Sequence, residues 1–105
     1  MRHYETMILL SPELSEEERK GILDNLTGIL DREKGQVIDE DHWGMRDLAY
    51  PVQKYMRGYY VRLEYAAPGA AVQELERNIK ITEGIMKFMS VKLAENYEAK
   101  AEEAA

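Results

Sequence analysis

Cationic and aromatic side chains alternate closely in the segment from Trp43 to Arg62. Its cations are Arg46, Lys54, Arg57 and Arg62, and its rings include Trp43, Tyr50, Tyr55, Tyr59 and Tyr60. Cations neutralise phosphates and flat rings stack on bases, so this mixture is typical of a surface that binds RNA. We therefore treat this segment as the first candidate for a binding site.

Residues for catalysis or metal binding are missing from the pattern. The chain has no cysteine, no recognisable Ser-His-acid arrangement and no glycine-rich phosphate loop after its first apolar run. Glu40 and His42 share strand parity, but no third ligand is near them in the sequence, and a zinc site needs at least three. We expect no enzyme, no metal, no cofactor and no small-molecule substrate.

No segment is suited to crossing a membrane. The longest apolar run near the N-terminus, residues 7–10, is far too short to span a bilayer, and Glu5 interrupts any signal peptide. The absence of cysteine suits a reducing compartment. We expect a cytoplasmic protein with no membrane partner.

Charge is distributed unevenly along the chain. The net charge is −6, but residues 42–63 contain four Lys or Arg against the single acid Asp47, and residues 77–93 contain four against Glu83 alone. The field at a binding surface depends on local charge rather than on the sum. An acidic protein can therefore still present a basic surface to RNA, although the acidic segment 11–41 is equally well explained as a solvated helix.

The first third of the chain predicts a strand and then a helix. Residues 2–10 alternate in a way that suits a central strand with apolar residues on both faces. Ser15 and Glu18 form a capping box, and the apolar residues from Ile22 to Leu30 follow helical spacing. Gly35 is the expected C′ residue that ends this helix.

The middle third predicts an antiparallel hairpin. Its first arm runs from Gln36 to Tyr50 and must end or leave its sheet near Pro51, since proline cannot donate to a ladder. Gly44 is the expected site of a bulge. After Gly58, the second arm runs to about Ala66.

The last third predicts a second helix and a final strand. Pro68 and Gly69 open the helix, residues 82–84 break it, and residues 85–93 form the strand. The Ala/Glu-rich residues 94–105 are expected to be an acidic tail that is disordered on its own. We therefore expect one folded domain, residues 1–93.

The order β-α-β-β-α-β predicts an α+β, ferredoxin-like fold. Right-handed crossovers place both helices on one face of a four-stranded antiparallel sheet, with the first and third strands in its centre. The other face, which we call the open face, is expected to carry Met7, Leu9, Tyr60, Arg62, Lys87 and Met89. An open face this apolar indicates a partner or ligand.

Three parts of the chain resemble the bacterial small-subunit ribosomal protein six family. They are the opening Met-Arg-His-Tyr-Glu, the segment from Trp43 to Lys54 with Gly58-Tyr59-Tyr60 after it, and the closing Met89-Ser90-Val91-Lys92. The resemblance covers residues 1–93. Two positions depart from the family pattern, because Ser90 replaces a usually apolar inward residue and Met86 replaces a frequently basic one.

The resemblance implies a function. Family members are structural proteins of the bacterial ribosome that bind the central domain of small-subunit ribosomal RNA as a heterodimer with small-subunit ribosomal protein eighteen. The candidate RNA-binding residues are Arg2, His3, Arg46, Lys54, Lys87 and Lys92, and we expect the cations to gather along a common, positively charged rim of the sheet, with Lys87 reaching onto its face. The candidate partner-binding residues are Trp43, Tyr50, Tyr60 and Arg62.

Purely structural roles for these residues remain open at this point. Arg46 and Lys54 flank Pro51 and could serve hairpin solubility alone, while Trp43 could merely cover the bulge. Arg62 could form a cross-strand pair with Glu5. We expect Lys87 on the sheet face and Lys92 at its rim, because the two differ in parity.

Two other functions also remain open. A protein of the RNA-recognition-motif type would stack single-stranded RNA on its sheet, and Arg57-Gly58-Tyr59-Tyr60-Val61 partly resembles the third-strand motif of that module. A small-molecule regulatory domain of the same fold is the third possibility. Such domains usually have a glycine turn after the first strand, where this chain has Ser11-Pro12-Glu13.

Overall fold

The structure, a computed structural model, describes residues 1–94 and confirms the predicted order of elements. The elements are β1 (Arg2–Leu10), α1 (Glu16–Arg32), β2 (Gln36–Val52), β3 (Tyr55–Ala67), α2 (Gly69–Ile81) and β4 (Ile85–Ala94). The final strand thus extends one residue beyond its predicted end. The rest of the predicted tail, residues 95–105, lies outside the described residues. No helix of residues 1–94 is long and apolar enough to span a membrane.

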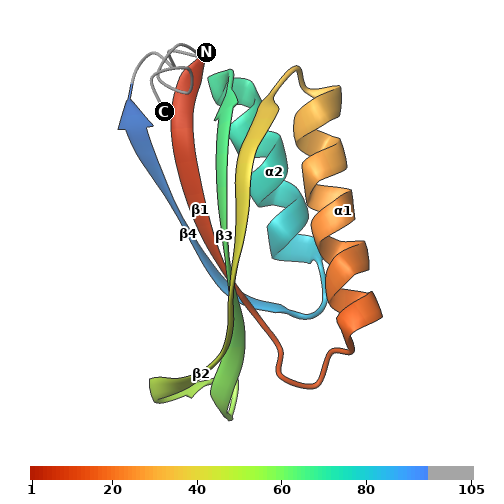
Figure 1. The fold of residues 1–105 in the computed structure, drawn as a ribbon, viewed down its shortest axis with the longest axis vertical. Helices are drawn as coiled ribbons and strands as arrows, with labels where there is room; N and C mark the ends of the chain where they lie inside the picture. Colours follow the sequence, from red (N-terminus) through yellow and green to blue (C-terminus); the bar gives the residue numbers. More distant parts are fainter. Residues whose placement is uncertain (95–105) are drawn as a thin grey trace.

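The sheet has the predicted topology. Its strands are antiparallel in the order β2-β3-β1-β4, so β1 and β3 are central. Both helices pack on one face of the sheet, and the described part of the chain leaves the other face uncovered (Figure 1). The ferredoxin-like arrangement is therefore confirmed.

The core lies between the helices and one face of the sheet. Alternate residues of the two central strands, such as Ile8 and Leu63, are fully buried there against leucines and isoleucines of α1 and α2. Thr6 is a buried polar residue in this layer, and its hydroxyl is hydrogen-bonded to Tyr65 Oη at 2.8 Å and to Ser90 Oγ at 2.9 Å. The unusual inward Ser90 therefore helps to satisfy a buried hydroxyl group.

Helix α1 begins as predicted and ends differently. Ser15 and Glu18 form the capping box. At the other end, Lys34 rather than Gly35 adopts the left-handed conformation (φ 68°), and the Gly35 amide donates to the Leu30 carbonyl at 2.7 Å. The prediction of Gly35 as C′ is thus wrong by one position. Gly35 is required for space instead, since a Cβ there would lie 3.1 Å from the Ala67 Cβ.

Both arms of the hairpin are longer, and its turn is shorter, than predicted. β2 continues through Pro51, and the chain reverses at Gln53 and Lys54, which both have positive φ, as a tight two-residue turn requires. The pairing of β2 with β3 shifts between Asp47 and Val52, so Pro51 lies where the regular ladder is interrupted. The predicted bulge at Gly44 (φ 88°) is confirmed.

Gly58 lies inside β3 instead of at its start. The strand already begins at Tyr55, and a Cβ on Gly58 would lie 2.3 Å from Leu9 Cδ1. The glycine therefore makes room for a buried leucine of β1 on the open face.

The far end of the hairpin extends beyond the helices (Figure 1). Although β2 and β4 form opposite edges of the sheet, the hairpin tip contacts the start of β4, where Gln53 Nε2 donates to the Met86 carbonyl at 3.4 Å. On the other side, Tyr55 Oη donates to Glu13 Oε1 at 2.6 Å. These contacts attach the tip to the start of β4 and to the segment between β1 and α1.

Candidate RNA- and partner-binding surfaces

The candidate RNA-binding cations form two groups instead of one rim. Arg2 starts β1 and Lys92 pairs with Tyr4, so both lie at one end of the sheet. The others, Arg46, Lys54 and Lys87, lie toward the hairpin tip. Lys87 and Lys92 are separated along β4 by about 16 Å at the usual rise of a strand. The expected common rim is therefore wrong, because the cations follow strands that run the full length of the sheet.

In the first group, Arg2 lies near the start of α2 and Lys92 lies near the end of β4. Both side chains are exposed. The Arg2 guanidinium lies so close to Gly69 that a Cβ on that glycine would be 2.6 Å from Nη1. Lys92 pairs with Tyr4, a residue of the helix-covered side, whereas Lys87 pairs with Leu9 of the open face. The predicted difference in placement between the two lysines is confirmed.

The second group combines its cations with aromatic rings. Lys87 Nζ donates to Tyr50 Oη at 2.9 Å and lies 5.3 Å from the centre of that ring. This hydrogen bond and the charge of Lys87 hold the pKa of Tyr50 below its ordinary value. Arg46 lies 6.0 Å from the Trp43 ring, and Lys54 occupies the turn. Positive charge thus lies beside exposed rings at two places toward the hairpin tip, a combination that suits contacts with RNA.

Trp43 lies at the bulge and remains 43 % exposed. Its ring centre is 6.4 Å from that of Tyr60, and its indole Nε1 donates to Asp41 Oδ2 at 2.9 Å. Tyr50 is 58 % exposed. Rings held in place yet open to solvent are well suited to anchor a protein interface.

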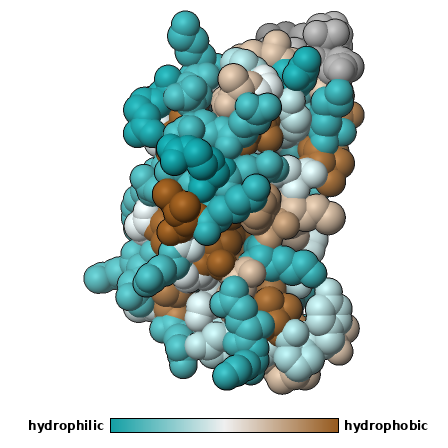
Figure 2. Space-filling model, turned by 180° about the vertical axis from the view of Figure 1, so that it is seen from behind, coloured by the Kyte–Doolittle hydropathy of each residue, from teal (hydrophilic) through white to brown (hydrophobic). Residues whose placement is uncertain are grey.

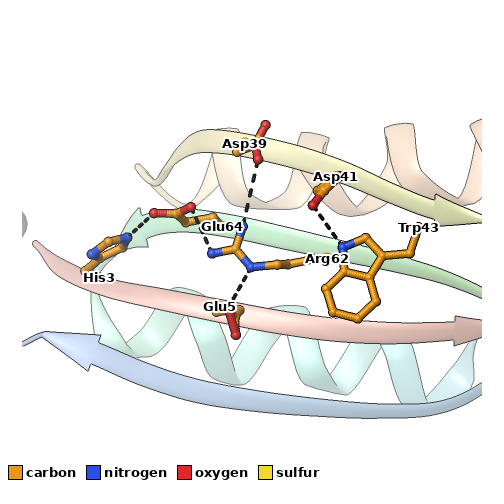
Figure 3. Close-up of polar contacts among 7 residues, drawn as sticks. All are labelled: His3, Glu5, Asp39, Asp41, Trp43, Arg62 and Glu64. Atoms are coloured by element: carbon orange, nitrogen blue, oxygen red, sulfur yellow. Dashed lines mark hydrogen bonds and ion pairs between the residues drawn. The ribbon is translucent and has the colours of Figure 1, made fainter. Parts of the chain in front are cut away.

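Arg62 is held by carboxylates on three strands, as Figure 3 shows. Its Nε donates to Glu5 Oε2 at 2.6 Å and its Nη2 to Glu64 Oε1 at 3.0 Å, while Nη1 lies 3.8 Å from Asp39 Oδ2. His3 Nε2 lies 2.6 Å from the other oxygen of Glu64. The Arg62–Glu5 pair, an open alternative from the sequence, is therefore present. We call Arg62, His3, Glu5, Asp39 and Glu64 the Arg62 cluster.

The cluster changes the proton affinity of Glu64. Partial burial pushes the pKa of this carboxyl upward, but the hydrogen bond from His3 and the hydrogen bond and charge of Arg62 outweigh it. The pKa of Glu64 therefore lies below its ordinary value, and that of Arg62 lies above its own, chiefly through the hydrogen bond to Glu5. Glu64 and Arg62 are therefore both charged at neutral pH.

Sequence reasoning named Glu5 as a possible partner of Arg62 but missed the other two carboxylates of this cluster, Asp39 and Glu64. The acids at residues 39–41 are poor strand formers and by themselves indicate only an edge strand. Strand parity was the available signal, since Asp39 pairs with Glu64 and Asp41 with Arg62 on the same face. The register shift between Val37 and Asp39 hid that signal.

The open face carries the apolar residues that were predicted for it. Met7 pairs with both Arg62 and Met89, and Leu9 pairs with both Tyr60 and Lys87. A hollow of about 280 Å³ is lined by Met7, Leu9, Tyr60, Lys87, Phe88 and Met89. Met89, Val91 and Leu93 of β4 are exposed. Figure 2 shows hydrophobic surface broken into separate patches by hydrophilic side chains.

Comparison with known proteins gives a consistent result. The family model described as ribosomal protein S6 matches residues 3–92. The small ribosomal subunit protein bS6 of Nitratidesulfovibrio vulgaris (Miyazaki F) is 63 % identical over 98 residues, covering 93 % of this chain and 97 % of that protein. The protein of the same name from Oleidesulfovibrio alaskensis is 62 % identical over the full length of both chains. The crystal structure of 30S ribosomal protein S6 from Thermotoga maritima matches with a TM-score of 0.83 and 27 % identity, covering 98 % of this chain and 94 % of that one.

Proposed function

Because the chain belongs to the ribosomal protein S6 family of the small ribosomal subunit, we propose that it binds the central domain of small-subunit ribosomal RNA as a heterodimer with small-subunit ribosomal protein eighteen. Its role in this proposal is structural rather than catalytic, and it acts on the ribosome in the bacterial cytoplasm. The observation that carries the proposal is the family match over residues 3–92, together with relatives that align along almost the whole chain.

The two groups of cations support an RNA contact at each end of the sheet. Arg2 and Lys92 form one contact, and Arg46, Lys54 and Lys87 form the other. Cations at both ends neutralise phosphates of separate RNA segments, so the rigid sheet fixes the distance between these segments. The protein thereby recognises the shape of a folded RNA rather than its base sequence.

Weak binding by the chain alone follows from its charge. Few cations converge at either end, and the net charge of −6 opposes the approach of a polyanion. A partner that is bound next to the chain adds its own RNA contacts, and the joint surface then binds more tightly than either protein alone. The heterodimer is thus the RNA-binding unit in this proposal.

The other two functions are less well supported. Base stacking by an RNA-recognition motif uses the open face, but here that face carries the carboxylates of the Arg62 cluster and Met7 and Leu9 on β1. The hollow on that face is small and partly bounded by flexible methionines. The family match favours neither a stacking module nor a small-molecule domain.

A titration tests the proposal. We expect central-domain ribosomal RNA to bind the chain weakly, and the chain with protein eighteen at least about tenfold more tightly. Equal affinity with and without protein eighteen would contradict the heterodimer. Tight binding of unstructured RNA by the chain alone would favour the RNA-recognition-motif function.

The first group of cations has a matched control. The double variant Arg2→Ala, Lys92→Ala should weaken RNA binding by the heterodimer. The slope of log affinity against log salt concentration should become less steep by about 0.9 for each lost contact with a duplex phosphate. Lys20→Ala with Lys80→Ala removes the same charge from exposed helix positions and should have little effect. Equal losses of RNA affinity in the two double variants would remove Arg2 and Lys92 from the proposed site.

A further inference from the structure

A carboxylate, an imidazole and a phenol form a hydrogen-bonded chain on the helix-covered side of the hairpin. Glu40 Oε2 lies 2.6 Å from His42 Nε2, and His42 Nδ1 lies 3.0 Å from Tyr59 Oη. Glu40 pairs with Leu63 and His42 pairs with Val61, and both of these β3 residues are fully buried in the core. Since directly paired residues share a face of the sheet, the chain lies on the side opposite to the open face.

The chemistry of the three groups fixes the direction of both hydrogen bonds when the imidazole is neutral. An ionised carboxylate only accepts, so His42 Nε2 carries the ring proton and donates to Glu40. His42 Nδ1 is then an acceptor, and the Tyr59 hydroxyl donates to it. A base is thus held against the phenol proton, and the carboxylate behind the base stabilises the imidazolium that forms when this proton moves.

The chain borders a hollow of about 470 Å³ between α1 and the hairpin. The hollow is lined by Glu16, Arg19, Lys20, Leu23, Asp24, Glu40, His42 and Tyr59. Arg19 Nη1 donates to the Leu14 carbonyl at 3.1 Å, and the guanidinium carbon lies 4.1 Å from the centre of the Tyr59 ring. A fixed positive charge therefore faces the ring on which negative charge grows as the hydroxyl loses its proton. The side chains of His42 and Glu40 are 40 % and 34 % exposed, so the hollow is open to solvent.

We propose that Tyr59 is an acylation site of this protein, with His42 as its general base. The Tyr59 oxygen attacks the carbonyl carbon of an activated acyl donor, such as an aryl ester, and forms the new C–O bond. The bond from that carbon to the leaving group breaks, and the leaving group departs with the electron pair. The phenol proton moves to His42 Nδ1, which later releases it to solvent. The product is an O-acyl tyrosine, and the inference does not depend on the proposed RNA and partner contacts.

Two other tyrosines at the surface lack a base in this position. Tyr55 Oη donates to Glu13 at 2.6 Å, and this hydrogen bond raises the pKa of the Tyr55 phenol. The hydrogen bond from Lys87 lowers the pKa of Tyr50, but an ammonium group that donates to the phenol oxygen accepts no proton from it. Tyr50 therefore reacts only through the fraction of its phenol that ionises in solution, whereas Tyr59 gives its proton to His42 during the attack.

Acetylation by p-nitrophenyl acetate tests the site. The full chain is treated with a limiting amount of the ester at neutral pH, and the acetylated residues are located by mass spectrometry. Hydroxylamine then separates acetyl-tyrosine, which it cleaves, from acetyl-lysine, which it leaves intact. We expect Tyr59 to be acetylated at least about tenfold faster than Tyr50 or Tyr55, since a positioned general base accelerates such a step by that much or more. Acetylation of Tyr50 or Tyr55 at the rate of Tyr59 would overturn the inference.

Three variants separate the base, the nucleophile and a control. His42→Gln should slow acetylation of Tyr59 by about tenfold or more, while the matched Tyr55→Phe should change it less than twofold. Tyr59→Phe keeps the ring and should abolish the fast phase of p-nitrophenolate release. Circular dichroism checks that each variant is folded. Acetylation of His42→Gln at the parent's rate would overturn the inference, and so would a fast phase that persists in Tyr59→Phe, because the imidazole itself would then be the nucleophile.

The pH dependence distinguishes general-base catalysis from simple ionisation of the phenol. The charged or titrating groups that face His42 and Tyr59 across the hollow are Glu16, Arg19, Lys20 and Asp24 of α1 and Glu40 of β2. With His42 as the base, acetylation of Tyr59 should rise as the imidazole loses its proton and level off well below about pH 10, the ordinary pKa of a phenol. A rate that rises steadily to pH 10 in the parent chain and in His42→Gln alike would overturn the inference.

Discussion

The two faces of the sheet are built from alternate residues of the same strands and yet differ in almost every physical property. On β3, Leu63 is fully buried against the helices, while its neighbours Arg62 and Glu64 hold ion pairs on the open face. The helix-covered face gains its stability from burial and satisfied hydroxyls. The open face keeps charges and apolar side chains accessible. The comparison teaches that one face maintains the fold and the other remains free for partners.

The largest expected effect is on the helix-covered face. Leu63→Ala removes a fully buried side chain between the central strands and the helices, and we expect it to lower the free energy of unfolding by about 2–5 kcal/mol. Urea unfolding followed by circular dichroism measures the change. A loss below about 1 kcal/mol would show that this face is not packed as described.

A smaller effect is expected for the buried hydroxyl groups of the same face. Tyr65→Phe removes the hydrogen bond between Tyr65 Oη and Thr6 but leaves Thr6 its bond to Ser90. We expect a loss of about 1 kcal/mol in the free energy of unfolding. Thr6→Val, which removes both bonds at nearly constant volume, should cost more than Tyr65→Phe. A larger loss for Tyr65→Phe than for Thr6→Val would mean that the hydroxyls of Thr6, Tyr65 and Ser90 are not linked through Thr6.

The next effect concerns the open face and depends on pH. Because the pKa of folded Glu64 lies below the ordinary value of 4.5, its charge stabilises the fold above that pH, and the stabilisation is lost as the pH falls through the lowered pKa. We expect the parent chain to lose stability between neutral pH and pH values below 4.5 more steeply than Glu64→Gln. Urea midpoints across this range provide the measurement, and parallel curves would contradict the ion pairs of the Arg62 cluster.

Sequence patterns predicted the division between the faces but not how distant parts of one face meet. Strand parity assigned Leu63 inward and Arg62 outward, because alternation is a local property. The approach of Asp39 to Arg62 depends on a register shift in β2, and the contact of Tyr50 with Lys87 depends on the path of the hairpin tip. Both are set by tertiary structure.

Two local errors have a similar origin. Gly35 was expected to take the left-handed position at the end of α1, but Lys34 takes it, and Gly35 lies in the crowded place where the chain passes close to Ala67. The first arm was expected to end or leave its sheet near Pro51; the ladder is interrupted there, but β2 continues to Val52 and the chain turns only at Gln53 and Lys54. In both cases the sequence correctly identified a residue that interrupts regular structure. Its exact role depends on residues far away in the sequence, which crowd Gly35 and pair with the strand that contains Pro51.

The smallest expected effect on stability completes the comparison between the faces. Met89 is 60 % exposed at the rim of the hollow, so Met89→Ser removes little buried area and should change the free energy of unfolding by less than about 0.5 kcal/mol. The same substitution should weaken the proposed heterodimer with protein eighteen if this face is its interface, because an exposed apolar side chain at a hollow becomes buried only when a partner binds. Urea unfolding and a binding titration of one protein preparation separate the two effects. A loss of stability without a loss of binding would make the open face a second structural surface, and the distinction between the two faces would then fail.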